Sequence, residues 1–532
     1  MADTYDVIIC GAGSGGGFLA GEIAAHGSVL ILDAGPYISG PTIPGFGHGA
    51  RRRFSTQINL GTFIPDGVNS INQGTDAFQY PLYADESNPN SASLTREARV
   101  VGGGSFINAG AWIRPRRIDW DGFAAETGVT NWTKEAFDPH FQRAERILSV
   151  RRDPREKWNP GSVLYEQTAR SLGIPVYMTA SNRSSSCLYC GHNNAGMPCK
   201  YDVLMSTAIT QIPKALKAGA QLVDNATVLR VEISNRKATG VTYLKDGQTI
   251  TANARKLVVV SAGAIGSPLI LFSSGVNLLN PNVGKYLRAH PGISVEAVVP
   301  GRDWNSSRGY QWNCYHYGMD PNGQPMDTLI YASASFPNAI WLSSQVGGFG
   351  KQYKDLMRLF PQRLGTWIFV TKPNIFGRVM GRVHVPVIQY PIVTVDGIPE
   401  RKTLVDTIAA VRLCGTVFKQ MGAVYTEPDP ATPDMFLARE LALRLPSAGL
   451  FHPQGSCRAG SSPRTSVVDS NCMSHDIQNL MCCDASVIPN HISANTNAIT
   501  MAIGSKAADF VNSQILDRAS STKTAAQEVT QE

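Results

Sequence analysis

The sequence lacks any apolar run of about 18 residues, so no transmembrane helix of ordinary length is expected. The first residues, MADTYDVIICG, contain no basic stretch and no small-residue cleavage site, and no secretory signal is expected. The ten cysteines are scattered, which is typical of a reducing compartment rather than of a disulfide-stabilised domain. Together these absences predict a cytoplasmic protein without a membrane span.

The sequence also lacks blocks of like charge. Its 48 lysine and arginine residues and 41 aspartate and glutamate residues are spread along the chain and leave a net charge of +7, which does not predict a nucleic-acid partner. The 43% of hydrophobic residues and the 50 glycines in 532 residues are typical of a globular protein of roughly two or three domains. The polar, aperiodic stretch 517–532 is predicted to be a disordered tail.

The amino-terminal sequence YDVIICGAGSGGGFLAGEIAAHGSVLILDAG predicts a strand, a turn, a helix and a second strand. Gly11, Gly13 and Gly16 form the pattern G-x-G-x-x-G at the turn. In a dinucleotide-binding unit these glycines allow the tight turn, the approach of a pyrophosphate to the backbone, and helix–strand packing. Asp33 ends the second strand, where an acid can accept hydrogen bonds from an adenosine ribose. The sequence therefore predicts a dinucleotide site, for either FAD or NAD.

Further motifs follow along the chain. They are ARVVGGGSFINAGAWIRPRRIDWDGF (98–123), GAIGSPLILFSSGV (263–276), VGKYLRAHP (283–291), HPQGSCRAG (452–460) and CDASVIPNHISANTNAITMAIGSKAADFV (483–511). Together with the amino-terminal unit they resemble, in order, the signatures of the glucose-methanol-choline (GMC) oxidoreductases. Asn277 stands where the family's second signature usually ends in glycine. The range 297–446 resembles the family only in length and general character.

The resemblance implies an α/β protein, α+β overall, with a Rossmann-like FAD-binding domain and a second domain of antiparallel sheet backed by helices. We expect the FAD-binding domain to be discontinuous and to comprise 1–160, 200–296 and 447–516. The range 297–446, with parts of 40–95 and 161–199, is expected to bind the substrate. Some family members attach FAD through a histidine before the glycine loop, but SASLTREARVVGGGS contains none, so the FAD is expected to be non-covalent.

The resemblance also implies which residues contact the FAD. They are Gly11, Gly13, Ser14, Gly16, Asp33, Ala34, Arg99, Val101, Gly103, Gly104, Asn108, Ala109, Val228, Ala262, Asp484, Ala485, Asn495 and Thr496.

Oxidation of an alcohol by hydride transfer needs a base for the hydroxyl proton and donors for the developing alkoxide. The resemblance implies that His452 is the base and that Asn495, whose amide offers two N–H donors, is its partner. His491 lies close to Asn495 in the chain, but at a position that the family leaves variable, and His290 is interpreted as structural. In this hypothesis the proton passes to His452, the hydride passes to flavin N5, and oxygen or another acceptor reoxidises the flavin.

An oxidase is favoured slightly over a dehydrogenase with a non-oxygen acceptor. Two other classes stay open: a GMC-fold lyase with a structural FAD, and a non-catalytic flavin-binding scaffold. Trp341, Trp367 and Phe369 indicate either a ring-binding pocket or an ordinary core.

Cys187, Cys190 and Cys199, with His192 between them, form a separate cluster. The favoured interpretation is a loop with structural thiols or one disulfide, so no metal is predicted. Zinc and an iron–sulfur centre are alternatives, although Ala195 stands where a ligand cysteine of the latter would be.

Overall fold

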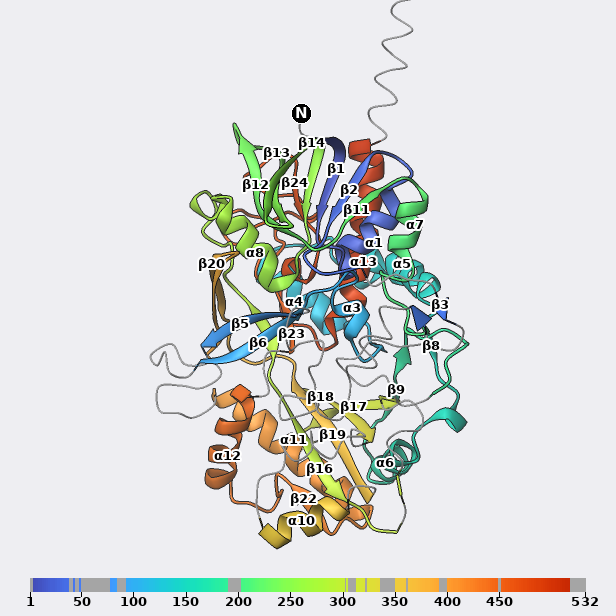
Figure 1. Cartoon of the computed structure of the whole chain (residues 1–532). Helices are drawn as coiled ribbons and strands as arrows, with labels where there is room; N and C mark the ends of the chain where they lie inside the picture. Colours follow the sequence, from blue (N-terminus) through green and yellow to red (C-terminus); the bar gives the residue numbers. More distant parts are fainter. Residues whose placement is uncertain are drawn as a thin grey trace, which may run out of the picture.

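The computed structural model describes residues 3–37, 42–43, 47–48, 77–83, 92–189, 202–301, 303–304, 312–320, 323–334, 350–359, 362–391, 400–447 and 451–516. Two sheets lie at opposite ends of the molecule, and segments from both ends of the chain meet between them (Figure 1).

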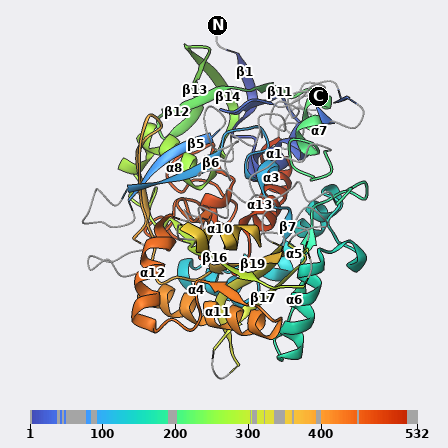
Figure 2. The same ribbon diagram turned by 60° about the horizontal axis from the view of Figure 1, so that its bottom comes forward.

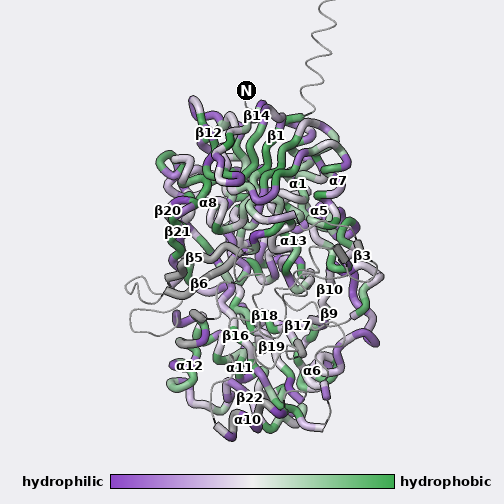
Figure 3. Tube along the Cα trace, in the orientation of Figure 1, coloured by the Kyte–Doolittle hydropathy of each residue, from purple (hydrophilic) through white to green (hydrophobic). Residues whose placement is uncertain are grey.

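The first sheet has seven strands in the order β11-β2-β1-β14-β13-β12, with β24 also paired to β14. Strands β1, β2, β24 and the end of β14 run parallel and are buried, and their apolar runs explain the hydrophobic centre of this sheet in Figure 3. The bounds are β1 Thr4–Cys10, β2 Val29–Leu32, β11 Gln221–Val223, β12 Ala226–Ser234, β13 Lys237–Lys245, β14 Gln248–Val260 and β24 Leu480–Cys482.

Helix α13 (Thr496–Val511) packs beside this sheet between α1 (Ser14–Ile23) and α5 (Lys134–Ile147), and α7 (Gln211–Lys217) packs on the other side of α1 (Figure 1). The contact between α1 and α13 is close because it is made through glycine. A Cβ on Gly504 would lie 2.7 Å from the Gly15 carbonyl oxygen. The start of α1 therefore lies against the middle of α13.

The second sheet has six antiparallel strands in the order β22-β16-β19-β18-β17-β9. Helices α6, α11 and α12 pack against it, and α11 runs across its face in Figure 2. The bounds are β9 Tyr177–Met178, β16 Gly292–Val298, β17 Cys314–Met319, β18 Pro325–Ala334, β19 Arg363–Val370, β22 Tyr425–Glu427, α6 Pro160–Ser171, α11 Arg401–Gln420 and α12 Asp434–Ser447.

Smaller elements connect the two sheets. Strand β15 pairs with β23, and a four-stranded sheet in the order β20-β21-β5-β6 lies beside α8. The bounds are β5 Ala77–Tyr83, β6 Ala92–Ala98, β15 Arg288–His290, β20 Arg378–Arg382, β21 Val385–Gln389, β23 Phe451–Gln454, α3 Gly104–Ile107, α4 Arg117–Thr127, α8 Gly263–Ser273 and α10 Gly350–Arg358.

This mixture of a largely parallel sheet and an antiparallel sheet backed by helices confirms the predicted fold class. The predicted tail, 517–532, lies outside the described residues. No helix in the described ranges is both long and apolar enough to cross a membrane.

Candidate active site

The glycines of the predicted dinucleotide turn divide into two kinds. Gly11 and Gly16 are packed against the protein, since a Cβ on either would lie 2.1–2.2 Å from a backbone carbonyl oxygen. Gly13 faces free space, because a Cβ there would meet only the Cα of Gly103, at 3.9 Å. A Cβ on Gly104 would meet nothing within 4 Å. The glycine turn at 11–16 and the glycine loop at 102–104 thus leave backbone without side chains around a common space. Such backbone allows the close approach of a large ligand.

Asp33 organises this turn from the end of β2. Its two carboxylate oxygens accept from the backbone N–H groups of Ala12 and Gly35, each at 2.8 Å. Burial raises the pKa of the Asp33 carboxyl to about 6. Arg99 supports the same region, because its Nε donates to the Ala34 carbonyl at 2.9 Å. The contact of Asp33 with a ribose stays a prediction.

Two buried amide groups at this site have nitrogens without a hydrogen-bond partner. Asn108 accepts from the Gly110 N–H at 2.8 Å through Oδ1, and its Nδ2 has no partner among the described residues. Asn497, which the sequence did not single out, accepts from the Ser14 hydroxyl at 2.9 Å, and its Nδ2 is likewise unpartnered in the described chain. Because buried donors are almost always satisfied, these two amides indicate a ligand with acceptor atoms.

Among the other predicted cofactor residues, Asp484 lies at the start of α8. Asp484 accepts from the Gly263 N–H at 2.8 Å and from the Ser267 hydroxyl at 2.5 Å, so it fixes the start of α8. The rest of the predicted set lies on neighbouring elements: Val101 before α3, Ala109 after it, Val228 in β12, Ala262 before α8, Ala485 after Asp484, and Thr496 at the start of α13.

Glu97, in β6, is a partly buried acid that no sequence motif indicated. Its Oε1 accepts from the Ile265 N–H at 3.4 Å, at the start of α8. Burial, reinforced by the nearby charge of Asp484, raises the pKa of Glu97 to about 8. Its position in the motif-free stretch before the glycine loop gives no sequence signal for this role.

His452 and Asn495 are in direct contact, at 3.0 Å between His452 Nε2 and Asn495 Nδ2. His452 lies on β23 with φ of +56°, a strained conformation for a residue other than glycine, which is often found at functional sites. Asn495 is the N-cap residue of α13, yet its side chain makes no capping hydrogen bond and is free to face His452. Its Oδ1 accepts instead from the Tyr331 hydroxyl of β18.

The other two histidines near this pair differ in position. His491 is buried, with only 8% of its surface exposed, and its Nε2 has no hydrogen-bond partner in the described part of the chain. That His491 is not the base stays a prediction. His290, interpreted from the sequence as structural, instead lies with its Nδ1 2.9 Å from His452 Nδ1. The pairing of β15 with β23 brings these rings together, and nothing in the motifs predicted that pairing.

An aromatic wall, formed by Trp312, Tyr331, Trp367, Phe369 and Phe451, adjoins His452. The Phe369 ring lies 5.3 Å from the His452 ring and 5.2 Å from that of Phe451. The Trp312 ring lies 5.1 Å from Tyr331, and its buried indole N–H has no partner among the residues described. Trp367 and Phe369 are therefore core residues that also border the candidate site. Trp341 lies outside the described residues.

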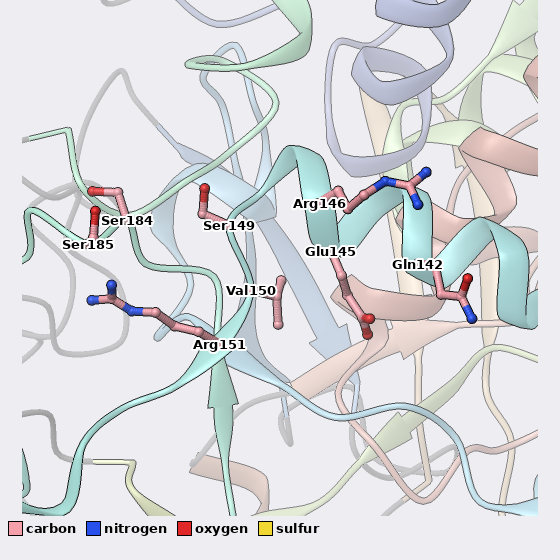
Figure 4. A pocket seen from close by; sticks show the side chains of 8 residues that line it. All are labelled: Gln142, Glu145, Arg146, Ser149, Val150, Arg151, Ser184 and Ser185. Carbon is pink, nitrogen blue, oxygen red and sulfur yellow. The ribbon is translucent and has the colours of Figure 1, made fainter.

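A hollow of about 590 Å³ lies elsewhere, beside the end of α5 (Figure 4). Its lining includes Glu145, Arg146, Arg151 and Ser184, none of which is a predicted site residue. It adjoins the segment that leads to Cys187, whose thiol is free. Cys190, His192, Ala195 and Cys199 lie outside the described residues, and the described ones contain no group of three side chains able to hold a metal ion.

The chain belongs to the GMC oxidoreductase family. The family model described as GMC oxidoreductase matches residues 5–292, and a second with the same description matches 382–504. The chain is 25% identical to the oxygen-dependent choline dehydrogenase of Paraburkholderia xenovorans, over 96% of this chain and 94% of that protein. An uncharacterized GMC-type oxidoreductase of Mycobacterium bovis is also 25% identical, over 96% of this chain and all of its own length.

Solved structures show the same fold. Pyridoxine 4-oxidase from Mesorbium loti superimposes with a TM-score of 0.71 at 18% identity, covering 95% of this chain and 98% of that one. A formate oxidase from Aspergillus oryzae superimposes with a TM-score of 0.72 at 16% identity, covering 96% and 99% of the two chains. These structures show the fold, and the matches to the two family models confirm the predicted family.

Proposed function

We propose that this protein uses FAD to oxidise an alcohol to an aldehyde or ketone, with His452 as the base. The observation that supports this proposal most strongly is the contact of His452 with Asn495. Asn495 precedes α13, and the start of α13 is joined to the glycine turn by the hydrogen bond between Ser14 and Asn497. In this proposal the discontinuous unit 1–160, 200–296 and 447–516 binds the FAD, and 297–446 binds the substrate in a cytoplasmic enzyme. Strand β16 begins at Gly292 and therefore crosses the proposed boundary at 296.

The residues present fit FAD. Gly13 and Gly104 expose backbone to the common space, and the unpartnered amides of Asn108 and Asn497 are donors for ligand oxygens or nitrogens. The amino-terminal end of α13 adds a positive partial charge, which favours an electron-rich ligand group there. When bound, the flavin supplies a two-electron acceptor that takes the hydride at N5.

His452 is suited to accept the hydroxyl proton. Burial lowers the pKa of its imidazole to about 4, so the ring is neutral and has a free lone pair near neutral pH. One amide hydrogen of Asn495 faces His452, which leaves the second hydrogen to stabilise the developing alkoxide. The aromatic wall limits the access of water to this pair and strengthens those interactions.

The experiment that tests this function is anaerobic mixing of the purified yellow protein with a panel of alcohols, while flavin absorbance near 450 nm is followed. Bleaching is expected with at least one alcohol, whereas a lyase or a flavin-binding scaffold would leave the absorbance unchanged. Peroxide release and dye reduction by the same mixtures then separate an oxidase from a dehydrogenase. The named oxidases among the similar structures support oxygen as the acceptor.

The FAD is expected to be released completely by acid precipitation, because no histidine precedes the glycine loop in SASLTREARVVGGGS. The measurement is the flavin absorbance of the supernatant against that of the pellet. Yellow colour that stays with the pellet would show a covalent link and contradict this prediction.

Asn495→Ala is expected to slow anaerobic flavin reduction by about 10- to 10³-fold, because loss of one oxyanion donor typically costs at most about 2.7–4 kcal/mol. Stopped-flow reduction by a saturating alcohol measures it. His491→Ala is the matched control from the same loop, and it is expected to cost much less. A reversed order for the two variants would mean that the assignment of the closing segment is wrong.

A further inference from the structure

A continuous chain of contacts runs through the candidate base. It starts at His290 in β15, passes through His452 in β23 and Asn495 before α13, and ends at Tyr331 in β18. His290 Nδ1 and His452 Nδ1 are 2.9 Å apart, and His452 Nε2 and Asn495 Nδ2 are 3.0 Å apart. The Tyr331 hydroxyl then donates to Asn495 Oδ1.

Two ring nitrogens that face each other at this distance share one hydrogen. Burial lowers the pKa of His452 to about 4, and burial together with the charge of His452 lowers that of His290 well below its ordinary value. Both rings are therefore neutral near neutral pH, and each has one N–H. Only one of the two Nδ1 atoms is a donor, and the other must accept.

The neighbours of the pair decide which ring donates. The amide nitrogen of Asn495 lies 3.0 Å from His452 Nε2 and can only donate, and its orientation is fixed because Asn495 Oδ1 accepts from the Tyr331 hydroxyl. His452 Nε2 is therefore an acceptor, and the hydrogen of the neutral His452 ring lies on Nδ1. His290 Nδ1 then accepts this hydrogen, and the hydrogen of His290 lies on Nε2.

The far end of the chain agrees with this assignment. Asn495 presents its amide hydrogens to His452 Nε2, and its Oδ1 is held by the Tyr331 hydroxyl. The opposite tautomer of His452 would point its Nε2–H at the amide hydrogens of Asn495. On the other side of His290, Gln454 Nε2 lies 3.4 Å from both His290 Nε2 and the His452 carbonyl oxygen, at the limit of hydrogen-bond distance.

We propose that His290 is a positioning residue that holds His452 in the tautomer with its hydrogen on Nδ1, so that Nε2 carries the lone pair that takes the substrate's proton. This inference rests on the proposed function. In the proton-transfer step the O–H bond of the alcohol breaks, an N–H bond forms at His452 Nε2, and the Nδ1–H of the resulting imidazolium remains donated to His290. The role resembles that of the third group that orients the base in a catalytic triad.

The charged groups packed around the pair also favour a neutral His290. His491, which carries Arg288, Lys372 and Lys402 among its electrostatic neighbours, also interacts with His290. Positive charges around His491 therefore disfavour a further proton on this group of histidines.

The first test measures the tautomer and does not depend on turnover. The holoenzyme is labelled with ¹⁵N in the histidine rings, and two-bond proton–nitrogen spectra distinguish a protonated ring nitrogen from a bare one. The signals are assigned by their loss in His290→Leu and His452→Ala. We expect hydrogen on Nδ1 of His452 and on Nε2 of His290, and we expect His290→Leu to move the hydrogen of His452 to Nε2. Hydrogen on His452 Nε2 in the wild type, or an unchanged His452 spectrum in His290→Leu, would overturn the proposal.

The second test measures the rate constant for anaerobic flavin reduction. His290→Leu is expected to slow it about 10²-fold, at the lower end of what a general base contributes, with unchanged FAD content and substrate affinity. His290→Asn is expected to stay close to the wild type, because its Oδ1 accepts where Nδ1 did. His316→Leu is the matched control: His316 is equally buried but bonds to Tyr165 and to a backbone carbonyl.

A loss of stability in His316→Leu without a loss of rate would confirm that the effect of His290 is specific to the base. Equal slowing in His290→Leu and His316→Leu, or no rescue by His290→Asn, would contradict it. If no alcohol bleaches the flavin of the wild type, the proposed function fails, and the nitrogen signals still decide whether His290 sets the tautomer of His452.

Discussion

His452→Ala is expected to slow anaerobic flavin reduction by about 10²- to 10⁴-fold, the usual contribution of a general base, while FAD stays bound. Alanine retains the Cβ, so the strain at φ of +56° is unchanged and the strand β23 should persist. The measurement is stopped-flow reduction by a saturating alcohol, together with the flavin content of the variant. A near-normal rate of flavin reduction in His452→Ala would show that His452 is not the base.

The pH dependence gives an independent check on the same residue. Because the pKa of His452 is lowered to about 4, the wild-type rate should be flat near neutral pH and fall as pH drops through about 4. The folded protein also resists protonation of this ring more than the unfolded chain does, whose histidine titrates near 6.5. Stability is therefore lost as pH falls from about 6.5 toward 4, and rates in that range are best measured after a rapid pH jump.

Gly13→Val is expected to give a folded protein that contains no flavin. The backbone at Gly13 has φ of −70°, which any residue can adopt, and a Cβ there meets only the Cα of Gly103, at 3.9 Å. The branched side chain would instead occupy the space in which the predicted pyrophosphate approaches the turn. The ratio of absorbance at 450 nm to that at 280 nm measures the flavin content, and circular dichroism measures the fold.

The matched control is Gly122→Val in α4, where a Cβ would meet only the Asn490 side chain, at 3.6 Å. This variant should keep both its fold and its flavin. Gly13→Val with a full complement of flavin would show that the glycine turn is not the dinucleotide site. Unfolding of Gly13→Val would be unexpected, in contrast to Gly15, where a Cβ would lie 2.0 Å from the Cys483 carbonyl oxygen.

The parts that could be predicted from the sequence are those with a local signal. The strands β1 and β2 follow from apolar runs, and the roles of Gly11 and Gly16 follow from the spacing of the turn. The closing helix follows from its apolar period. The contact of His452 with Asn495 required the family resemblance, because 43 residues separate the two in the chain.

The missed features depend on tertiary pairing. His290 and His452 are 162 residues apart and meet only because β15 pairs with β23, two short strands without an alternating pattern. Glu97 and the start of α8 meet through packing between the four-stranded sheet and α8, and Asn497 is one of several polar residues at the start of a helix. These contacts join segments that are far apart in the chain, so local sequence preferences do not predict them.

The way in which β24 completes the first sheet has a consequence for synthesis on the ribosome. This strand, Leu480–Cys482, pairs with the end of β14, and the next residues close over α1 at Gly15. The nascent chain therefore exposes the apolar edge of β14 and one side of α1 until nearly all of the protein has been translated. We expect partially synthesised chains to need protection by chaperones and to bind no flavin, so the cofactor would enter only after translation of the closing segment.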